Sequence, residues 1–355
     1  MLETITRLSH EFGTSDYVKG GGGNTSVKDD MTLWVKPSGV TLAGLTPQKF
    51  VALDRVRLRE LFEVKPPAEP SAREALVKDM MARALCPGST GRASVEAPLH
   101  ESFSARYVVH THPCLVSGMV CSKRAEATCR ELFPEALWVE YVDPGYTLCA
   151  HVRQAIPQYV AQNGQEPGIV FLQNHGVFVA GDTPEEIRAR YDRIMGRLRQ
   201  AYQDAGVSTT LTIGPAPTDL MVAEVTVRLR DLMGADQTVQ VVGSGIFAAA
   251  DGPITPDHIV YSKAWLHFGM PTAESLLVFQ NAHGYMPRVI VNGRGVFGVG
   301  ANANTAQLAL ELAQDGALVK QLAQAFGGLN NLDKRASDFI ENWEVEAYRR
   351  QQAAG

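Results

Sequence analysis

The stretch YVVHTHP, residues 107–113, contains two histidines that are one residue apart and follow β-branched residues. Side chains at positions i and i+2 of a β-strand point to the same face of a sheet. His110 and His112 can therefore reach one metal ion if the strand extends to the second histidine. A catalytic zinc ion needs a third protein ligand and an open position for chemistry.

The third ligand that we expect is His175, in the sequence GIVFLQNHG at residues 168–176. The apolar run indicates a buried strand, and the Asn-His-Gly that follows ends it. His175 then lies at a strand end, as His110 does, and neighbouring strand ends can converge on one site. The alternative for any single histidine is an ordinary core or surface residue, and we favour it for five others: His100, His151, His258, His267 and His283.

The glycine-rich segment KGGGGNTSVK, residues 19–28, is a second candidate feature. It is not a nucleotide-binding P-loop, because the GK[ST] ending is missing and no helix follows directly. Backbone N–H groups of glycines can still form a nest for an anion, with side-chain donors from Asn24, Thr25 and Ser26. Ser38 and Gly39 offer another such turn. A flexible turn without a ligand is the alternative.

Glu96, in RASVEAPLHESF at residues 92–103, precedes the histidine pair by fourteen residues. It could be a general base beside the metal, or a carboxylate at a helix N-terminus that suits the helix dipole. The sequence leaves both readings open. Glu101, in the same expected helix, is interpreted as solvated.

The elements that must position these residues alternate between strands and helices. Strands are expected near residues 32–36, 107–110, 138–142 and 168–172. Helices are expected near residues 1–18, 94–105, 115–122, 148–162 and 183–203. This alternation predicts an α/β fold.

Two domains are expected, residues 1–212 with the candidate metal site and residues 213–355 as a smaller α/β unit. The segment SGVTLAGLTPQKFV (38–51) resembles SGIFAAADGPITPDHIV (244–260), and NHGVFVAGDTPEEI (174–187) resembles GRGVFGVGANANTAQL (293–308). The second unit could therefore be a degenerate copy of the first. Arg294 then stands where His175 stood, and no metal site is expected in the copy. The alternative is that glycine-rich junctions look alike.

The bulk composition argues against several classes of partner. The formal net charge is −5 without a basic stripe, so nucleic acid is not expected to bind. No run of 18 apolar residues exists, and the amphipathic N-terminus lacks the apolar core of a signal peptide, so we expect neither membrane association nor secretion. The five cysteines form no CxxC pair and are expected to be reduced thiols in the cytoplasm.

Taken in order, GGGNTSVK, KPSG, SVEAPLH, VVHTHP and LQNHGVFVAG resemble the class II aldolase/adducin family over roughly residues 1–205. Four longer segments resemble more narrowly the aldolase portion of bifunctional rhamnulose-phosphate aldolase/dehydrogenase proteins: GGGNTSVKDDMTLWVKPSG, TPDHIVYSK, PRVIVNGRGVFGVG and AQAFGGLNNLDKRASDFIENWEVEAYRRQ. The chain ends where their dehydrogenase domain would begin. No GxGxxG motif follows a strand, so no nicotinamide site is expected.

The resemblance implies a three-layer α/β/α sandwich around a largely antiparallel sheet. Such proteins are usually tetramers with sites between subunits, so a homo-oligomer is expected. The resemblance also implies that His110, His112 and His175 bind zinc and that Glu96 is the catalytic acid/base. Tyr141, in VEYVDPG, matches a tyrosine that protonates or stabilises the aldehyde half of the substrate across a subunit interface.

The resemblance further implies a phosphate-binding set: Gly23, Asn24, Ser38, Gly39 and Ser94. The family often has two serines before the glutamate, and here the second is Val95. One phosphate donor is therefore missing, and the anion of the substrate could be bound differently. Adducin shares the fold but lacks the metal histidines, so the presence of all three favours an enzyme.

The candidate metal ligands and Glu96 predict one reaction, and three other functions stay open as alternatives. A metal held by three histidines could polarise the carbonyl of a ketose 1-phosphate and stabilise the enediolate left by retro-aldol cleavage. The expected function is a metal-dependent aldehyde-lyase that uses zinc, or else manganese or cobalt. The alternatives are a decarboxylase of a 3-oxo acid sugar phosphate, a sugar-phosphate 4-epimerase, in which an aspartate stands at the Glu96 position, and a non-catalytic adducin-like scaffold.

Overall fold

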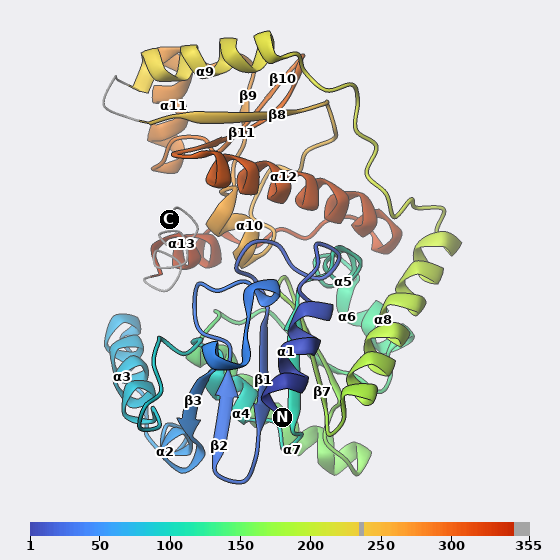
Figure 1. Cartoon of the computed structure of the whole chain (residues 1–355). Coiled ribbons are helices and arrows are strands. Elements are labelled where there is room, and N and C mark those ends of the chain that lie inside the picture. Colours follow the sequence, from blue (N-terminus) through green and yellow to red (C-terminus); the bar gives the residue numbers. More distant parts are fainter. Residues whose placement is uncertain (234–237, 344–355) are drawn as a thin grey trace. The chain divides into compact units, whose positions relative to one another are not determined.

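The computed structural model describes residues 1–233 and 238–343 of the chain (Figure 1). Contacts divide the chain into two units. The first consists of Met1–Val116 and Glu126–Leu198, and the second of Ser117–Ala125 and Arg199–Gly355. The expectation that residues 1–212 and 213–355 are separate domains stays a prediction.

A seven-stranded sheet forms the centre of the first unit, in the order β3-β2-β1-β4-β7-β6-β5. Its strands are β1 (Asn24–Lys28), β2 (Thr32–Val35), β3 (Val51–Asp54), β4 (Tyr107–Thr111), β5 (Leu137–Val139), β6 (Ile169–Leu172) and β7 (Gly176–Gly181). All neighbouring strands are antiparallel except β5 and β6, which are parallel. The largely antiparallel sheet expected from the sequence is confirmed.

Helices α4 (Ala97–Glu101) and α7 (Tyr146–Asn163) cover one face of this sheet. Leu99 of α4 and Val152 of α7 belong to one buried cluster with Val108 of β4. Strand residues alternate between the two faces. Even-numbered positions of β4 therefore face α4 and α7, and odd-numbered positions face the other side.

Helices α1 (Leu2–Glu11) and α8 (Pro184–Asp204) cover the opposite face. The hydroxyl of Tyr191, in α8, lies 2.8 Å from that of Thr111 in β4, and the ring of Phe12, at the end of α1, lies 4.3 Å from the Tyr191 ring. The mixed α/β fold is thus a sandwich of three layers, as expected. The remaining helices of the first unit are α2 (Arg55–Glu60), α3 (Pro70–Arg83), α6 (Ala125–Leu132) and the 3₁₀ turns η1 (Leu42–Gly44) and η2 (Pro47–Lys49). Helix α5 (Cys114–Val120) lies at the boundary, because Ser117–Ala125 belongs to the second unit.

Glu101, at the end of α4, is buried, and its interpretation as a solvated residue was wrong. Arg55 donates from Nε to both carboxylate oxygens, at 3.0 and 2.9 Å, and Arg59 donates to one of them at 2.7 Å. Buried charges are tolerated when they are paired in this way. Both partners come from α2, which lies far from Glu101 in the sequence.

Lys28, the last residue of β1, is also buried. Its ammonium donates to the carbonyl oxygens of His100 and Phe103, at 2.6 Å each, and so satisfies backbone acceptors at the end of α4. Burial lowers the pKa of Lys28 to about 8.

The second unit has its own four-stranded sheet, in the order β8-β11-β10-β9. Its strands are β8 (Gln240–Ser244), β9 (His267–Phe268), β10 (Val289–Asn292) and β11 (Gly295–Gly300), and its helices are α9 (Asp219–Met233), α10 (Pro256–Tyr261), α11 (Ala273–His283), α12 (Ala303–Ala323), η3 (Gln324–Phe326) and α13 (Lys334–Asn342). Leu310 of α12 packs with Val296 on one face, and Leu229 of α9 packs with Phe297 on the other.

The sheet of the second unit repeats part of the sheet of the first. The order β8-β11-β10-β9 corresponds to β4-β7-β6-β5, and in both sheets the last pair is parallel and the others are antiparallel. Helices α8 and α12 follow the hairpins and have 21 residues each. This correspondence supports the hypothesis of a degenerate copy, which stays a prediction.

One difference separates the two hairpins. Leu172 pairs with Gly176, so three residues form the turn between β6 and β7. Asn292 pairs with Gly295, so two residues form the turn between β10 and β11. The turn that carries His175 is therefore one residue longer than its counterpart.

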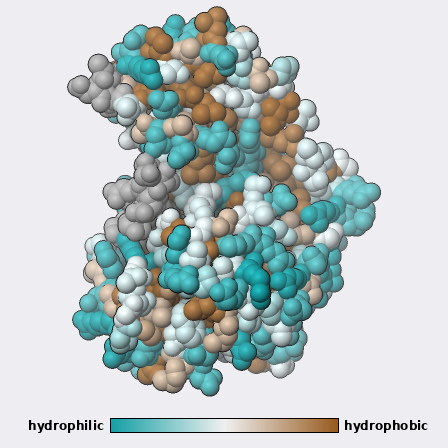
Figure 2. Space-filling view, viewed as in Figure 1, coloured by the Kyte–Doolittle hydropathy of each residue, from teal (hydrophilic) through white to brown (hydrophobic). Residues whose placement is uncertain are grey.

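Polar residues cover most of the visible surface of the first unit, whereas apolar residues gather in several places over the second (Figure 2). The most exposed large apolar side chains of the second unit are Leu220, Val278, Phe268 and Leu277. Within residues 1–233 and 238–343, no helix has the length and apolar character needed to cross a membrane.

Candidate metal centre

The candidate centre is formed where β1, β4 and β7 are neighbouring strands of the sheet. His110 pairs directly with Asn24 of β1 and with Phe178 of β7. Directly paired residues of neighbouring strands project from the same face. The Phe178 ring stacks on the His110 ring, with 3.9 Å between their centroids, and so holds the imidazole in place.

Three histidine Nε2 atoms converge at this point. His112 directly follows β4, and its Nε2 lies 2.9 Å from that of His110. His175 Nε2 lies 3.4 Å from His110 Nε2, and the three ligand atoms lie within 4.8 Å of one another. Ligands at 2.0–2.1 Å from a tetrahedral zinc ion are about 3.3 Å apart. The predicted histidines thus form a group that could hold one metal ion.

The protonation of His110 follows from its backbone partner. Its Nδ1 lies 3.0 Å from the carbonyl oxygen of Val177, which can only accept a hydrogen bond. Nδ1 therefore carries the proton, and Nε2 turns a lone pair toward the other two histidines. Burial lowers the pKa of His110, which favours the neutral form that a metal requires.

The sequence Asn-His-Gly suits the turn that presents His175. Asn174 has a positive φ of 51°, and asparagine adopts this left-handed conformation more readily than most residues. A Cβ atom on Gly176 would lie 2.5 Å from His112 Cδ2 and 2.5 Å from the Thr111 carbonyl oxygen. Only glycine leaves room here for the His112 ring.

Glu96 lies beside the three histidines and is 7% exposed. Its Oε1 is 3.3 Å from His110 Nε2 and 3.8 Å from His175 Nε2. Its Oε2 accepts a hydrogen bond from Asn24 Nδ2 at 3.2 Å. Glu96 occupies the N-cap position of α4, but its side chain makes no capping hydrogen bond. The sequence left two interpretations of Glu96 open, a general base beside a metal and a carboxylate that suits the helix dipole. This geometry agrees better with the first.

The KPSG turn runs beside the segment that leads to Glu96. Ser38 N donates to the carbonyl oxygen of Arg92 at 2.8 Å, and Ser94 N donates to that of Lys36 at 3.2 Å. The Ser94 hydroxyl oxygen accepts a hydrogen bond from Glu96 N at 3.3 Å. Two segments of the predicted phosphate set are thus adjacent, and their role in binding phosphate stays a prediction.

Gly23 ends the glycine-rich loop directly before β1. It has a positive φ of 71°, and a Cβ atom there would lie 2.9 Å from the carbonyl oxygen of His110 and 2.6 Å from Val18 Cγ1. Glycine therefore permits both the backbone conformation and the close approach of the loop to β4, the strand that carries His110.

The segment NTSVK was expected to extend the glycine-rich loop, but it is the buried strand β1. Its alternate side chains face α4: Asn24 reaches Glu96, and the Ser26 hydroxyl lies 2.8 Å from His100 Nδ1. Thr25 faces the opposite side and lies 2.7 Å from the Ser9 hydroxyl. Thr25 and Ser26 are thus engaged within the protein, which corrects their assignment as anion donors. The period of two in Asn-Thr-Ser-Val-Lys was the signal that we missed.

Tyr141 lies in the loop after β5 and is linked to the turn that carries His175. Its backbone N donates to Gln173 Oε1 at 3.0 Å, and Gln173 is two residues before His175. Its hydroxyl donates to Asp143 Oδ1 at 3.4 Å. The predicted catalytic role of Tyr141 stays a prediction.

The second unit has other residues at the positions that correspond to the three histidines. Gly243 pairs with Phe297, the third residue of β11, as His110 pairs with Phe178, the third residue of β7. Gly245 then corresponds to His112, and Arg294 to His175. Arg294 forms an ion pair with Glu224 of α9 at 2.5 Å.

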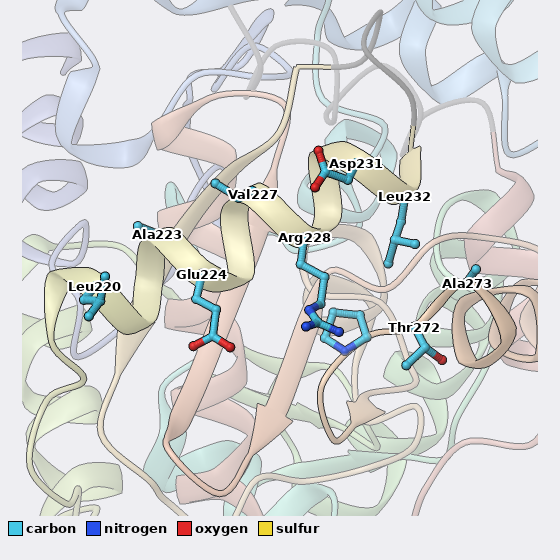
Figure 3. Close-up of a pocket in the computed structure, with 10 residues that line it drawn as sticks. Leu220, Ala223, Glu224, Val227, Arg228, Asp231, Leu232, Thr272 and Ala273 are labelled. Atoms are coloured by element: carbon cyan, nitrogen blue, oxygen red, sulfur yellow. The ribbon is translucent and has the colours of Figure 1, made fainter.

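Glu224 also lines a hollow of about 630 Å³ along α9 and the start of α11. Glu224 and Arg228 project from the same side of α9, and Thr272 lies at the start of α11 (Figure 3). The described residues of this hollow contain no group of histidines comparable to the one in the first unit.

Residues 3–201 match the family model described as class II aldolase and adducin N-terminal domain. No curated protein matches the chain in sequence. A class II aldolase domain of a Thermoplasma acidophilum protein is similar in structure, at 23% identity and a TM-score of 0.48, over 56% of this chain and 92% of that chain. A putative aldolase/epimerase/decarboxylase from Escherichia coli is similar at 18% identity and a TM-score of 0.40, over 57% and 88%. An L-fuculose-1-phosphate aldolase from Thermus thermophilus is similar at 16% identity and a TM-score of 0.36, over 57% and 93%.

The family match covers more than half of the 355-residue chain. It includes the three histidines, Glu96 and the glycine-rich loop. The chain belongs to the class II aldolase and adducin family.

Proposed function

We propose that this protein is a metal-dependent aldolase that cleaves a ketose 1-phosphate by retro-aldol chemistry. The observation that carries the proposal is the convergence of three Nε2 atoms beside the Glu96 carboxylate. A non-catalytic scaffold has no need for this buried arrangement. The resemblance to the aldolase portion of rhamnulose-phosphate aldolase/dehydrogenase proteins supports a ketose phosphate as the substrate.

His110, His112 and His175 would hold the ion, which we propose to be zinc, with manganese or cobalt as alternatives. When bound, a divalent ion supplies Lewis-acid polarisation of the substrate carbonyl. Glu96 moves the proton at the carbon that loses the aldehyde, because its Oε1 faces the same point as the three imidazoles. The surrounding burial excludes bulk water and strengthens these charge interactions.

Other residues of this chain would bind the rest of the substrate. The backbone N–H groups of Gly23 and Gly39 and the hydroxyls of Ser38 and Ser94 would receive the phosphate. Tyr141 would protonate or stabilise the oxygen of the departing aldehyde. In the family such tyrosines act across a subunit interface, so we propose a homo-oligomer, with a tetramer favoured, in the cytoplasm.

For the second unit we propose a role in assembly or as a lid over the site. The segment Ser117–Ala125 is itself part of this unit, where Asn330 N donates to the Cys121 carbonyl oxygen at 2.7 Å. A chain shortened after residue 212 is expected to lose activity or change its oligomeric state. Unchanged activity and unchanged mass in solution would contradict this role.

The test of the proposed function begins with the metal content of the purified protein, measured by elemental mass spectrometry. We expect about one divalent transition metal per chain, lost in a His112→Ala variant and retained in His151→Ala, which changes an exposed histidine of α7. Ketose 1-phosphates are then screened for release of dihydroxyacetone phosphate, and 3-oxo acid phosphates for release of carbon dioxide. Absence of metal after reloading with zinc or manganese would favour the scaffold, and carbon dioxide release alone would favour the decarboxylase.

A further inference from the structure

Asn24 is placed against Glu96 more firmly than a residue of a flexible anion-binding loop would be. It is the first residue of β1, is 1% exposed and pairs directly with His110. The close approach of Gly23 to the His110 carbonyl oxygen fixes the chain directly before it. Its amide therefore has little freedom to turn toward a ligand without breaking existing contacts.

The amide of Asn24 and the imidazoles divide the two oxygens of Glu96 between them. Nδ2 of Asn24 donates to Oε2 at 3.2 Å, whereas Oε1 faces His110 Nε2 at 3.3 Å. A hydrogen bond to one carboxylate oxygen fixes rotation about the terminal side-chain bond, which is otherwise broad and nearly two-fold. The Asn24 contact thus determines which way the other oxygen points.

Asn24 Oδ1 is buried, and the described residues provide it with no hydrogen-bond partner. An unpaired buried acceptor destabilises the folded protein. Stability alone therefore does not account for an amide at this position, and the unused acceptor is available to a hydroxyl of a bound molecule.

We propose that Asn24 is a positioning residue that orients the Glu96 carboxylate at the metal centre, a role distinct from the phosphate contact implied by the family resemblance. This inference rests on the proposed function, because it assigns Asn24 to the proton-transfer step of that reaction. Phosphate recognition is left to the neighbouring Ser38–Gly39 turn and to backbone N–H groups.

The kinetic test compares Asn24→Asp with Ser38→Ala in the metal-loaded enzyme. Asn24→Asp keeps the shape of the side chain but removes the donor to Glu96. We expect kcat to fall about 10- to 100-fold, the range in which misplaced catalytic groups act, with KM changed by less than about 3-fold. Ser38→Ala is expected to raise KM instead. An Asn24→Ser variant serves if Asn24→Asp does not fold.

Binding of inorganic phosphate provides a readout besides turnover. Phosphate is expected to raise the melting temperature of Asn24→Asp as much as that of the wild type, and to raise that of Ser38→Ala less. A higher KM with unchanged kcat in Asn24→Asp, together with loss of the phosphate effect, would overturn the proposal and assign Asn24 to the phosphate site.

A second test needs no turnover and uses the metal-free protein. Asn24→Asp places two carboxylates in contact and is expected to lower the melting temperature by at least about 4 °C. Adding Glu96→Gln restores a donor–acceptor pair, so the double variant is expected to be more stable than Asn24→Asp alone. An active wild type whose variants show no such coupling would refute the positioning role alone. Coupling in a wild type that cleaves no ketose phosphate would refute the proposed function and leave the contact as a structural one.

Discussion

Gly176→Ala is the substitution for which the structure makes the sharpest prediction. Gly176 is the first residue of β7 and directly follows His175. An added Cβ atom would lie 2.5 Å from His112 Cδ2 and 2.5 Å from the carbonyl oxygen of Thr111. One methyl group would therefore press on the His112 ring and on the last residue of β4 at the same time.

The magnitude follows from these distances. Ordinary contacts of a Cβ atom begin at about 3.4 Å, so the neighbours must move by roughly 0.9 Å. Overpacking of this kind costs about 1–3 kcal/mol of stability. Metal–ligand distances tolerate only about 0.2 Å, so the displaced His112 ring should weaken metal binding about 10- to 100-fold or more.

The assay is titration of the metal-free protein with zinc, followed by calorimetry and by thermal unfolding. Gly295→Ala is the matched control, because Gly295 begins β11 and its added Cβ would lie 2.6 Å from the carbonyl oxygen of Ser244. Both variants are expected to lower the melting temperature by a similar amount. Only Gly176→Ala is expected to lose zinc affinity.

Two results would refute this reasoning. Wild-type zinc affinity in Gly176→Ala would show that the His112 ring is not confined by this glycine. Equal loss of affinity in Gly295→Ala would show that general destabilisation, and not the displaced ligand, is the cause.

The remaining predictions concern stability. Lys28 has a pKa of about 8 when folded and about 10.4 when unfolded, so the unfolded chain binds more protons between these values and stability rises with pH in that window. Relative to Lys28→Met, the wild type should gain about 2.5 kcal/mol from pH 8 to pH 10.4 in urea unfolding, and parallel pH profiles would contradict this. Glu101→Gln should cost about 3–5 kcal/mol because Arg55 is left buried without its counter-charge. Arg83→Gln, which breaks an exposed pair with Asp79, should cost less than about 1 kcal/mol by the same measurement, and equal costs would argue against burial as the cause.

The grouping of the three histidines could be predicted because its signals are local. The i, i+2 spacing of His110 and His112 sets their common face, and the apolar run before Asn-His-Gly places His175 at the end of a strand. The antiparallel pairing of the sheet was predicted from the resemblance to a family, because the alternation of strands and helices alone does not specify how strands pair.

Residues whose state depends on distant partners could not be predicted in the same way. Glu101 looks like a surface residue until Arg55 and Arg59 of α2 are placed beside it. β1 was not recognised because its asparagine, serine and lysine are typical of loops, and only their contacts with α4 make a buried polar strand stable. In both cases, contacts with residues distant in the sequence stabilise a buried polar side chain, and the local sequence does not show these contacts.

The turn lengths of the two hairpins have an evolutionary consequence. Strands β6 and β7 pair across three turn residues, and β10 and β11 pair across two, so the ladder forms with either length. The shorter turn keeps a residue, Arg294, at the position that corresponds to His175, so the different side chain and the missing turn residue are two separate differences between the hairpins. Under the hypothesis of a degenerate copy, the described part of the second unit keeps the sheet order without the histidine group, so this arrangement of strands does not depend on a metal site.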